Sequence, residues 1–242
     1  MGAVSVIIPS RKEEFLNQTI RDIKEKFKED YEIIVTLDGA WEEPIKGVKY
    51  IYNKEAKGMR TAINQAVAEA AGKYIMKLDA HCMVDEGIDE KLKAAHQDNF
   101  VQVPRRKRYD PYKWELTDLD SPDIDYMMVR NFKGHKDNEK NRDPKLKKKL
   151  IDDTDVFQGS CYFMTKDFFN KLGLLDDKNF GKIGSEAIEI ALKCRHDGGR
   201  VVVNKNTWYA HAHIGCHYTG GTKEREKSRQ YMKILAKQLK YV

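Results

Sequence analysis

Two side chains that can hold a divalent cation lie two residues apart at the end of a predicted strand. Residues 74–78 form a short, mostly apolar run, and Asp79 and His81 follow it directly. Alternate side chains of an extended segment point the same way, so this carboxylate and imidazole can approach one ion. A cation held there would also neutralise a diphosphate. Because such pairs also occur on ordinary protein surfaces, the interpretation depends on a third ligand.

Candidates for the third ligand lie near the other end of the chain. Residues 208–213 form a strand-like stretch that carries His211 and His213, and His217 follows closely. A structural role explains any one of these histidines equally well. Together with His81, however, they make up four of the seven histidines, and the set favours a metal site.

Two carboxylates, Glu186 and Glu189, lie three residues apart at the start of a predicted helix over residues 185–196. This spacing projects both side chains from one face of the helix. Acidic groups at a helix N-terminus complement the helix dipole and cap free N–H groups, which is one explanation for them. The functional alternative is that one of them contacts a hydroxyl group of a substrate.

The elements that must position these groups alternate between strand and helix. The sequence predicts strands at residues 4–8, 31–35, 48–52 and 74–78, with amphipathic helices at residues 12–28 and 58–71. This alternation predicts an α/β fold with a parallel sheet covered by helices. Ligands of such sheets bind at the carboxyl ends of the strands. Three polar clusters fall at such ends: residues 9–13, Asp38 and residues 79–81.

The remainder of the chain has an irregular middle and an ordered end. Residues 104–154 are highly charged and poorly periodic, so we expect irregular structure there. Order resumes at residues 156–165, with helices at 166–171 and 185–196, a strand at 200–203 and a basic helix at 222–242. We expect one domain with a first lobe to about residue 103, a second lobe over residues 104–221 and the C-terminal helix.

Composition narrows the class of protein. The 242 residues include 44 Lys or Arg and 38 Asp or Glu, a formal net charge of +6. No apolar run approaches the ~20 residues of a membrane span, and the first residues lack the order of a signal peptide. We therefore expect a cytoplasmic protein with no membrane span. The four scattered cysteines form no CxxC pair, which argues against a thiolate zinc site and against structural disulfides.

Positive charge is concentrated in the middle of the chain. Residues 130–149, named here the basic segment, hold nine Lys or Arg against three acidic residues, and residues 105–108 form a second basic cluster. One interpretation is a solvated surface loop. The other is a landing surface for a polyanion or another anionic substrate.

Several motifs together resemble GT-A glycosyltransferases of the family-two kind. Residues 4–9, Leu37-Asp38-Gly39, Gly58-Met59 with Asn64, and Leu78-Asp79-Ala80-His81-Cys82 follow the order seen in those enzymes. The last motif resembles the metal motif of the polypeptide N-acetylgalactosaminyltransferases, which have D-x-H where relatives have D-x-D. The segments Gly184-Ser-Glu186-Ala-Ile-Glu189-Ile, Tyr209-Ala-His211 and Tyr218-Thr-Gly-Gly221 are similar to later segments of that family. The resemblance covers most of residues 3–221.

The resemblance implies a GT-A fold, with a Rossmann-like, mostly parallel sheet and flanking helices. It implies transfer of a hexosyl or N-acetylhexosaminyl group from a UDP-sugar to a hydroxyl acceptor, with the nucleotide sugar in the first lobe and the acceptor in the second. The implied ligands of Mn²⁺ (or Mg²⁺) are Asp79, His81 and His211, although His213 or His217 could replace His211. The implied nucleotide-sugar-binding residues are Pro9, Ser10, Arg11, Glu13, Asp38, Gly58, Arg60 and Asp79. Glu186 and Glu189 become the candidate catalytic residues.

Two departures from the family pattern change the expected chemistry. Inverting relatives have Glu-Asp where this chain has Glu186-Ala187, and that Asp is their general base. Ala187 cannot accept a proton, so we expect the product to retain the donor's anomeric configuration. The usual Asp-Asp is Leu37-Asp38 here, which removes one expected nucleotide contact.

Three alternatives remain open. A sugar-phosphate nucleotidyltransferase has a similar α/β plan, but it needs a Gly-rich basic loop after the first strand, and Ser10-Arg11-Lys12 has no glycine. A non-catalytic nucleic-acid-binding protein would explain the basic segments, although no nucleic-acid motif is present. A glycosyltransferase whose acceptor is DNA or another polyanion would explain both sets of features.

Overall fold

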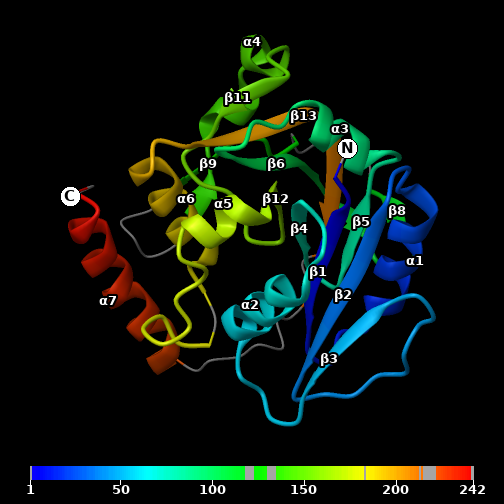
Figure 1. Ribbon diagram of the computed structural model, residues 1–242. Helices are drawn as coiled ribbons and strands as arrows, with labels where there is room; N and C mark the ends of the chain where they lie inside the picture. The colour runs from blue at the N-terminus through cyan, green and yellow to red at the C-terminus, as the bar shows by residue number, and fades with distance from the viewer. Residues whose placement is uncertain are drawn as a thin grey trace.

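The computed structural model describes residues 2–117, 123–129, 135–182, 184–212, 214 and 222–240. Figure 1 shows how its strands and helices are arranged. The strands are β1 (Val4–Ser10), β2 (Tyr31–Asp38), β3 (Lys49–Asn53), β4 (Tyr74–Leu78), β5 (Cys82–Val84), β6 (Phe100–Lys107), β7 (Tyr109–Asp110), β8 (Glu115–Leu116), β9 (Met127–Val129), β10 (His135–Asp137), β11 (Ile151–Asp153), β12 (Cys161–Thr165) and β13 (Arg200–His211). The helices are α1 (Leu16–Lys26), α2 (Met59–Glu69), α3 (Ile88–Ala94), the 3-10 helix η1 (Glu139–Arg142), α4 (Pro144–Lys147), α5 (Lys166–Lys171), α6 (Glu186–His196) and α7 (Thr222–Gln238).

Among the described residues, one nine-stranded sheet runs through the molecule in the order β3-β2-β1-β4-β12-β6-β13-β11, with β5 paired to β13. Neighbours are parallel from β3 to β4 and again between β6 and β13. Strand β12 is antiparallel to both β4 and β6, so β6 and β13 run in the same direction as β4. Six strands therefore share one direction, and the predicted mostly parallel α/β sheet is confirmed.

The centre of the sheet is buried because helices cover it. All seven residues of β1 are buried, which explains its near-continuous apolar sequence. Helix α2 packs on β1 and β2, and α6 packs on β6 and β13. Small residues such as Ala62 and Ala66 on the buried face of α2 allow a close approach to the strands. This packing fixes the carboxyl ends of β1 and β4, where the sequence predicts the site.

Most predicted elements are present, and two are corrected. Strand β4 and helix α5 have the predicted bounds. Strand β6 lies where the charged middle was expected to begin as irregular structure, and it crosses the expected lobe boundary at residue 103. Residues 200–203 and 208–211 belong to a single strand, β13, whose register against β6 shifts between Asn204 and Trp208. That shift interrupts the alternation of inward and outward side chains, so the sequence pattern does not indicate one continuous strand.

The basic cluster at residues 105–108 is not a solvated loop. Arg105 lies in β6 and makes two 2.7 Å hydrogen bonds to the carboxylate of Asp125. Arg106 is 7% exposed and is bonded to Gln158. These guanidinium groups stabilise the middle of the chain against the sheet, so they are not free to bind a polyanion.

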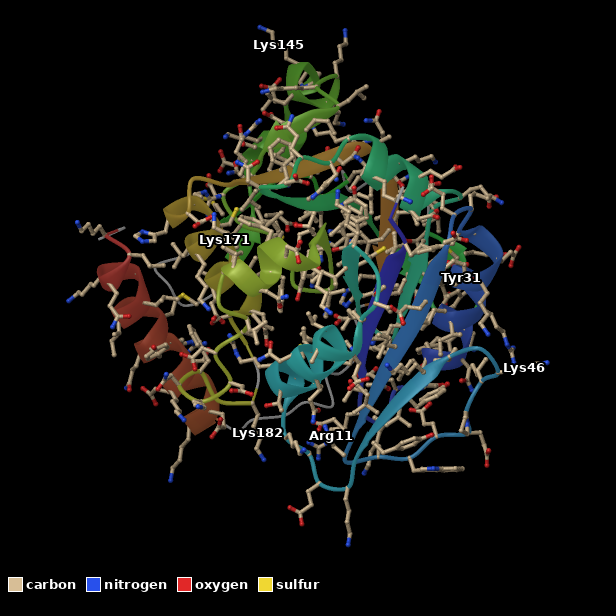
Figure 2. The ribbon with its side chains drawn as sticks, in the orientation of Figure 1. Arg11, Tyr31, Lys46, Lys145, Lys171 and Lys182 are labelled. Atoms are coloured by element: carbon tan, nitrogen blue, oxygen red, sulfur yellow. The ribbon has the colours of Figure 1, made fainter. Side chains whose placement is uncertain are left out.

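The described part of the basic segment contains β10, which pairs with β9, followed by η1 and by α4, which stands out at the top of Figure 1. Its C-terminal end is joined to the sheet by β11, which pairs with residues 202–204 of β13. Buried Lys205 connects α4 to the body by donating to the Leu146 carbonyl at 2.5 Å and to the Tyr126 hydroxyl at 2.7 Å. Figure 2 shows Lys145 at one end of the molecule, with Arg11 and Lys182 at the other. In the residues that the structure describes, no helix is both long and apolar enough to cross a membrane.

Candidate metal centre and nucleotide site

Three strands end at a common cavity, although their sequences are far apart. The cavity has a volume of about 200 Å³ and is lined by residues after β1, after β4 and at the end of β13. The described lining residues are Pro9, Glu13, Met59, Asp79, Ala80, His81, Gln158, His211 and Ile214. The predicted metal ligands therefore lie in one cavity.

Asp79, His81 and His211, the metal ligands expected from the sequence, lie together as a group that could hold a metal ion and is named here the triad. One ligand atom from each residue lies within 4.8 Å of the others. The Nε2 atoms of the two imidazoles are 3.0 Å apart, and Nε2 of His211 is 3.2 Å from Oδ2 of Asp79. At most one proton can lie between the two Nε2 atoms, and a divalent cation would replace it. Two imidazole nitrogens and one carboxylate oxygen form a donor set that suits a divalent transition metal.

Glu13 orients one of these imidazoles. Nδ1 of His81 lies 2.8 Å from Oε2 of Glu13, which is 5% exposed. A carboxylate only accepts, so the proton of neutral His81 lies on Nδ1 and leaves Nε2 as the metal-binding atom. Glu13 also lines the cavity, so its predicted role in nucleotide-sugar binding stays a prediction beside its contact with His81.

The protonation states of the triad also fit a cation. Burial raises the pKa of the Asp79 carboxyl, but Lys77, His211 and His81 outweigh this effect and hold that pKa well below its usual range. Burial lowers the pKa of His211 to about 4, against the opposing effect of its hydrogen bond with Asp79. At neutral pH the site therefore presents an ionised carboxylate and a neutral imidazole, the forms that bind metals.

Lys77 was not predicted as a site residue. It lies in β4, its side chain is 1% exposed, and its ammonium group contacts Oδ1 of Asp79 and donates to the Gly159 carbonyl at 2.6 Å. Charged side chains are seldom fully buried without a partner, so a lysine in the apolar run 74–78 was a usable sequence signal. Gln158, Met59 and Ile214 carried no comparable signal, and their place in the cavity follows only from the fold.

The other residues predicted after β1 are less accessible. Pro9 lines the cavity, whereas Ser10 is 0% exposed at the last position of β1. Arg11 is half-buried just beyond this strand. Of these three residues, Pro9 is the one with surface facing the described cavity.

Asp38 supports the backbone of the loop before α2. Its Oδ1 accepts from the Lys57 amide at 2.8 Å and from the Asn53 side chain at 2.9 Å, and its Oδ2 accepts from the Gly58 amide at 2.8 Å. Asp38 itself is 0% exposed. Both oxygens accept hydrogen bonds from within the protein, and the nucleotide-sugar contact expected of Asp38 stays a prediction.

Gly58 is required by a contact within the protein. It has a φ of +108°, and an added Cβ would lie 2.8 Å from the backbone of Lys182. The neighbour in this structure is the loop before α6, and the expected contact of Gly58 with the nucleotide sugar stays a prediction. The Met59 amide donates to the Lys182 carbonyl at 2.9 Å across the same contact.

Arg60 and Glu189 form a buried ion pair, so the expectation that they contact substrates is corrected. Both side chains are 0% exposed. Arg60 also donates to the Gly184 carbonyl at 2.6 Å, and its guanidinium carbon lies 4.1 Å from the centre of the Phe180 ring. Glu189 also accepts from Lys193 at 2.7 Å. The pair joins α2 to α6 and is closed to solvent.

Glu186 caps the loop before its own helix. Its Oε1 accepts from the Gly184 amide at 2.9 Å, which is the capping role that the sequence left open. Ala187 is 3% exposed in the first turn of α6. His213, His217 and the Tyr218-Thr-Gly-Gly221 segment lie outside the described residues.

A curled, mostly parallel sheet with an Asp-His-His group at its strand ends defines the chain as a glycosyltransferase of the GT-A fold. The chain belongs to the family described as glycosyl transferase family 2, whose model matches residues 5–173. This confirms the predicted class of enzyme and the family-two resemblance.

Two curated relatives of this chain carry the name polypeptide N-acetylgalactosaminyltransferase. The chain is 27% identical over 236 residues to putative polypeptide N-acetylgalactosaminyltransferase 13 of Drosophila melanogaster, covering 83% of this chain and 40% of the relative. It is 28% identical over 179 residues to polypeptide N-acetylgalactosaminyltransferase 3 of Taeniopygia guttata, covering 64% and 26%. The chain thus spans less than half the length of either relative.

Solved structures confirm the fold. GalNAc-T7, crystallised with UDP, GalNAc and Mn²⁺, superposes with a TM-score of 0.83 at 19% identity over 99% of this chain and 49% of that one. TarS of S. aureus superposes with a TM-score of 0.63 at 11% identity over 96% of this chain and 39% of that one. The GT-A arrangement therefore persists where little sequence identity remains.

Proposed function

We propose that this glycosyltransferase transfers a hexosyl or N-acetylhexosaminyl group from a UDP-sugar to a hydroxyl acceptor, and that the reaction requires Mn²⁺ or Mg²⁺. The observation that carries the proposal is the Asp79-His81-His211 triad at a cavity of about 200 Å³ in a family-two chain. GalNAc-T7, with the same fold, was crystallised with UDP, GalNAc and Mn²⁺.

Residues of the chain would hold the cation and orient its ligands. Asp79, His81 and His211 would hold the cation, and Glu13 keeps Nε2 of His81 directed at it. When bound, the cation acts as a Lewis acid that stabilises the diphosphate leaving group. Pro9 and Met59 provide apolar surface beside the triad, on which a nucleotide can pack.

We further propose that the reaction retains the donor's anomeric configuration. An inverting enzyme needs a general base beside the acceptor hydroxyl. Of the described residues that line the cavity, only Glu13 and Asp79 carry carboxylates. Glu13 accepts from His81 and Asp79 is paired with Lys77, so neither is available as that base. We expect product NMR to show the donor's configuration, and an inverted product would contradict the proposal.

Binding measurements test the metal site directly. We expect Asp79→Ala and His211→Ala each to abolish Mn²⁺-dependent UDP binding in calorimetry, because each removes a ligand. Exposed Asp98 and His196 supply matched controls, Asp98→Ala and His196→Ala, which should bind as the wild type does. Unchanged binding in both site variants would refute the assignment. A panel of UDP-sugars with Mn²⁺, scored for slow donor hydrolysis, would identify the donor.

The acceptor is less constrained than the donor. The cytoplasmic location and the polyanionic acceptor stay predictions from the sequence. The basic segment joins β13 near Val203, and His211 lies eight residues (211 − 203) further along that strand. At about 3.3 Å per residue, this places the segment's attachment on the order of 25 Å from the triad. A polyanion bound there would have to be long enough to reach the site.

A further inference from the structure

Lys77 is an unusual neighbour for a cation site. Its ammonium group is buried in the sheet and paired with Asp79, which is itself a proposed cation ligand. A positive charge beside a ligand opposes the binding of a cation. A role limited to stability is a poor explanation, because an apolar side chain would fill β4 at a lower desolvation cost.

The contacts of Lys77 fix the orientation of Asp79. Oδ1 of Asp79 faces the ammonium group, and Oδ2 faces Nε2 of His211 at 3.2 Å. The Asp79 amide donates to the Ser160 carbonyl at 2.8 Å, and Lys77 donates to the adjacent Gly159 carbonyl at 2.6 Å. The ammonium group of Lys77 thus holds the Asp79 carboxylate and the turn before β12 next to each other. Oδ2 of Asp79 is left to face His211 at the cavity.

The charge balance of the site favours an anion beside the cation. The carboxylates of Asp79 and Glu13 bring two negative charges to the triad, and the ammonium group of Lys77 brings one positive charge. A divalent cation would leave these buried groups with a net charge of +1. An uncompensated buried charge is costly, and an anion that binds beside it removes that cost. The diphosphate of a nucleotide supplies such an anion.

We propose that Lys77 is a positioning residue that directs Asp79 into the site and makes cation and nucleotide diphosphate bind jointly. This inference rests on the proposed function. Binding of Mn²⁺ alone is weak because Lys77 opposes it, and the negative diphosphate of UDP offsets that opposing charge. By linkage, Mn²⁺ must tighten UDP binding by the same factor by which UDP tightens Mn²⁺ binding.

Calorimetry with Mn²⁺ and UDP as probes tests this coupling. Kd for Mn²⁺ is measured without UDP and with saturating UDP, in the wild type and in Lys77→Met. We expect Lys77→Met to tighten Mn²⁺ alone by roughly tenfold and to reduce the coupling factor by a similar amount, since a unit charge a few ångströms away is worth at least one tenfold step. Lys77→Arg, which keeps the charge, should keep the coupling.

Lys205→Met is the matched control. The side chain of Lys205 is as buried as that of Lys77, but Lys205 lies in β13 away from His211 and contacts Leu146 instead of the triad. It should leave both Kd values unchanged, and thermal melting will verify that all variants are folded. If Lys77→Met is folded but weakens Mn²⁺ binding equally with and without UDP, or changes neither, the coupling role is refuted. If the wild type binds no Mn²⁺ even with UDP, the proposed function itself fails, and this inference fails with it.

Discussion

Glu13 determines which nitrogen of His81 faces the cavity. It follows β1, whereas His81 follows β4, so the two side chains meet only because these strands are neighbours. Carboxylates that hold a metal-binding histidine in this way raise its basicity and restrict its rotation. The sequence identified Glu13 as important, but only the strand pairing shows that it acts through His81.

We expect Glu13→Ala to lower the Mn²⁺ affinity by about 10–100-fold, because His81 then loses the acceptor that fixes its tautomer. Glu13→Gln should lower it less, since the amide oxygen still accepts from Nδ1. Glu14, which is exposed at the next position, supplies the control Glu14→Ala. Mn²⁺ titration in the presence of UDP measures the difference, and equal affinities for Glu13→Ala and the wild type would contradict this role.

At the scale of elements, the contact between α2 and α6 depends on one buried ion pair. Arg60 in α2 and Glu189 in α6 lie 129 residues apart in sequence and are both inaccessible to solvent. Glu189 also accepts from the Asp176 amide at 3.0 Å, so the pair fixes the loop before α6 as well. Both residues were expected to contact substrates, because a charged side chain at the start of a helix can contact a substrate or form a structural ion pair. The sequence alone does not distinguish these two roles. Partners so distant in sequence become visible only in the fold.

Arg60→Met should lower the free energy of unfolding by about 3–5 kcal/mol, because it leaves a buried carboxylate without its guanidinium partner. Lys49→Met removes an exposed partner, that of Glu69, and is expected to have no measurable effect. Urea titrations monitored by circular dichroism compare the two variants. A stability loss no larger for Arg60→Met than for Lys49→Met would show that the buried pair contributes little.

Periodicity predicted the first four strands and helices α1 and α2, because each has one clear pattern of apolar residues. It failed for β6, whose C-terminal half reads Pro104-Arg105-Arg106-Lys107. Arg105 is paired with Asp125 there, and Arg106 is paired with Asp137 and bonded to Gln158, all of them distant in sequence. Asp79 and His81 were predictable because they directly follow the recognisable strand β4, whereas His211 ends β13 and was singled out only by the family resemblance. Lys77 was visible as a charge in an apolar run, but its contact with Gly159 and that of Gln158 with Arg106 join residues that a single sequence does not connect.

At the scale of the whole molecule, the described part of the basic segment lies far from the cation site, since β11, which follows it, pairs with β13 on the order of 25 Å from the triad. Figure 2 shows Lys145 extending outward beyond α4, far from Arg11 near the end of β1. Charges this far apart are largely screened from one another at physiological salt. Whatever the basic segment binds, it does not alter the electrostatics of the triad directly.

Replacing Lys145, Lys147, Lys148 and Lys149 together with Gln should therefore leave Mn²⁺-dependent UDP binding and slow donor hydrolysis unchanged. If a polyanionic acceptor binds the segment, the same variant should raise its KM and flatten the salt dependence, since fewer counterions are released. Activity across a salt series measures both quantities. Equal slopes for variant and wild type would identify the segment as a solvated surface.

The wide sequence separation within the triad affects the order in which the protein matures. His81 and His211 are 130 residues apart, and they meet only after β12 and β6 have been inserted between β4 and β13. At a synthesis rate of 5–20 residues per second, His211 is therefore made roughly 6–25 seconds after His81. A nascent chain or a truncated fragment has at most a two-ligand site. Cation binding at the proposed site would therefore require that the sheet is complete, with its last long strand, β13, already paired.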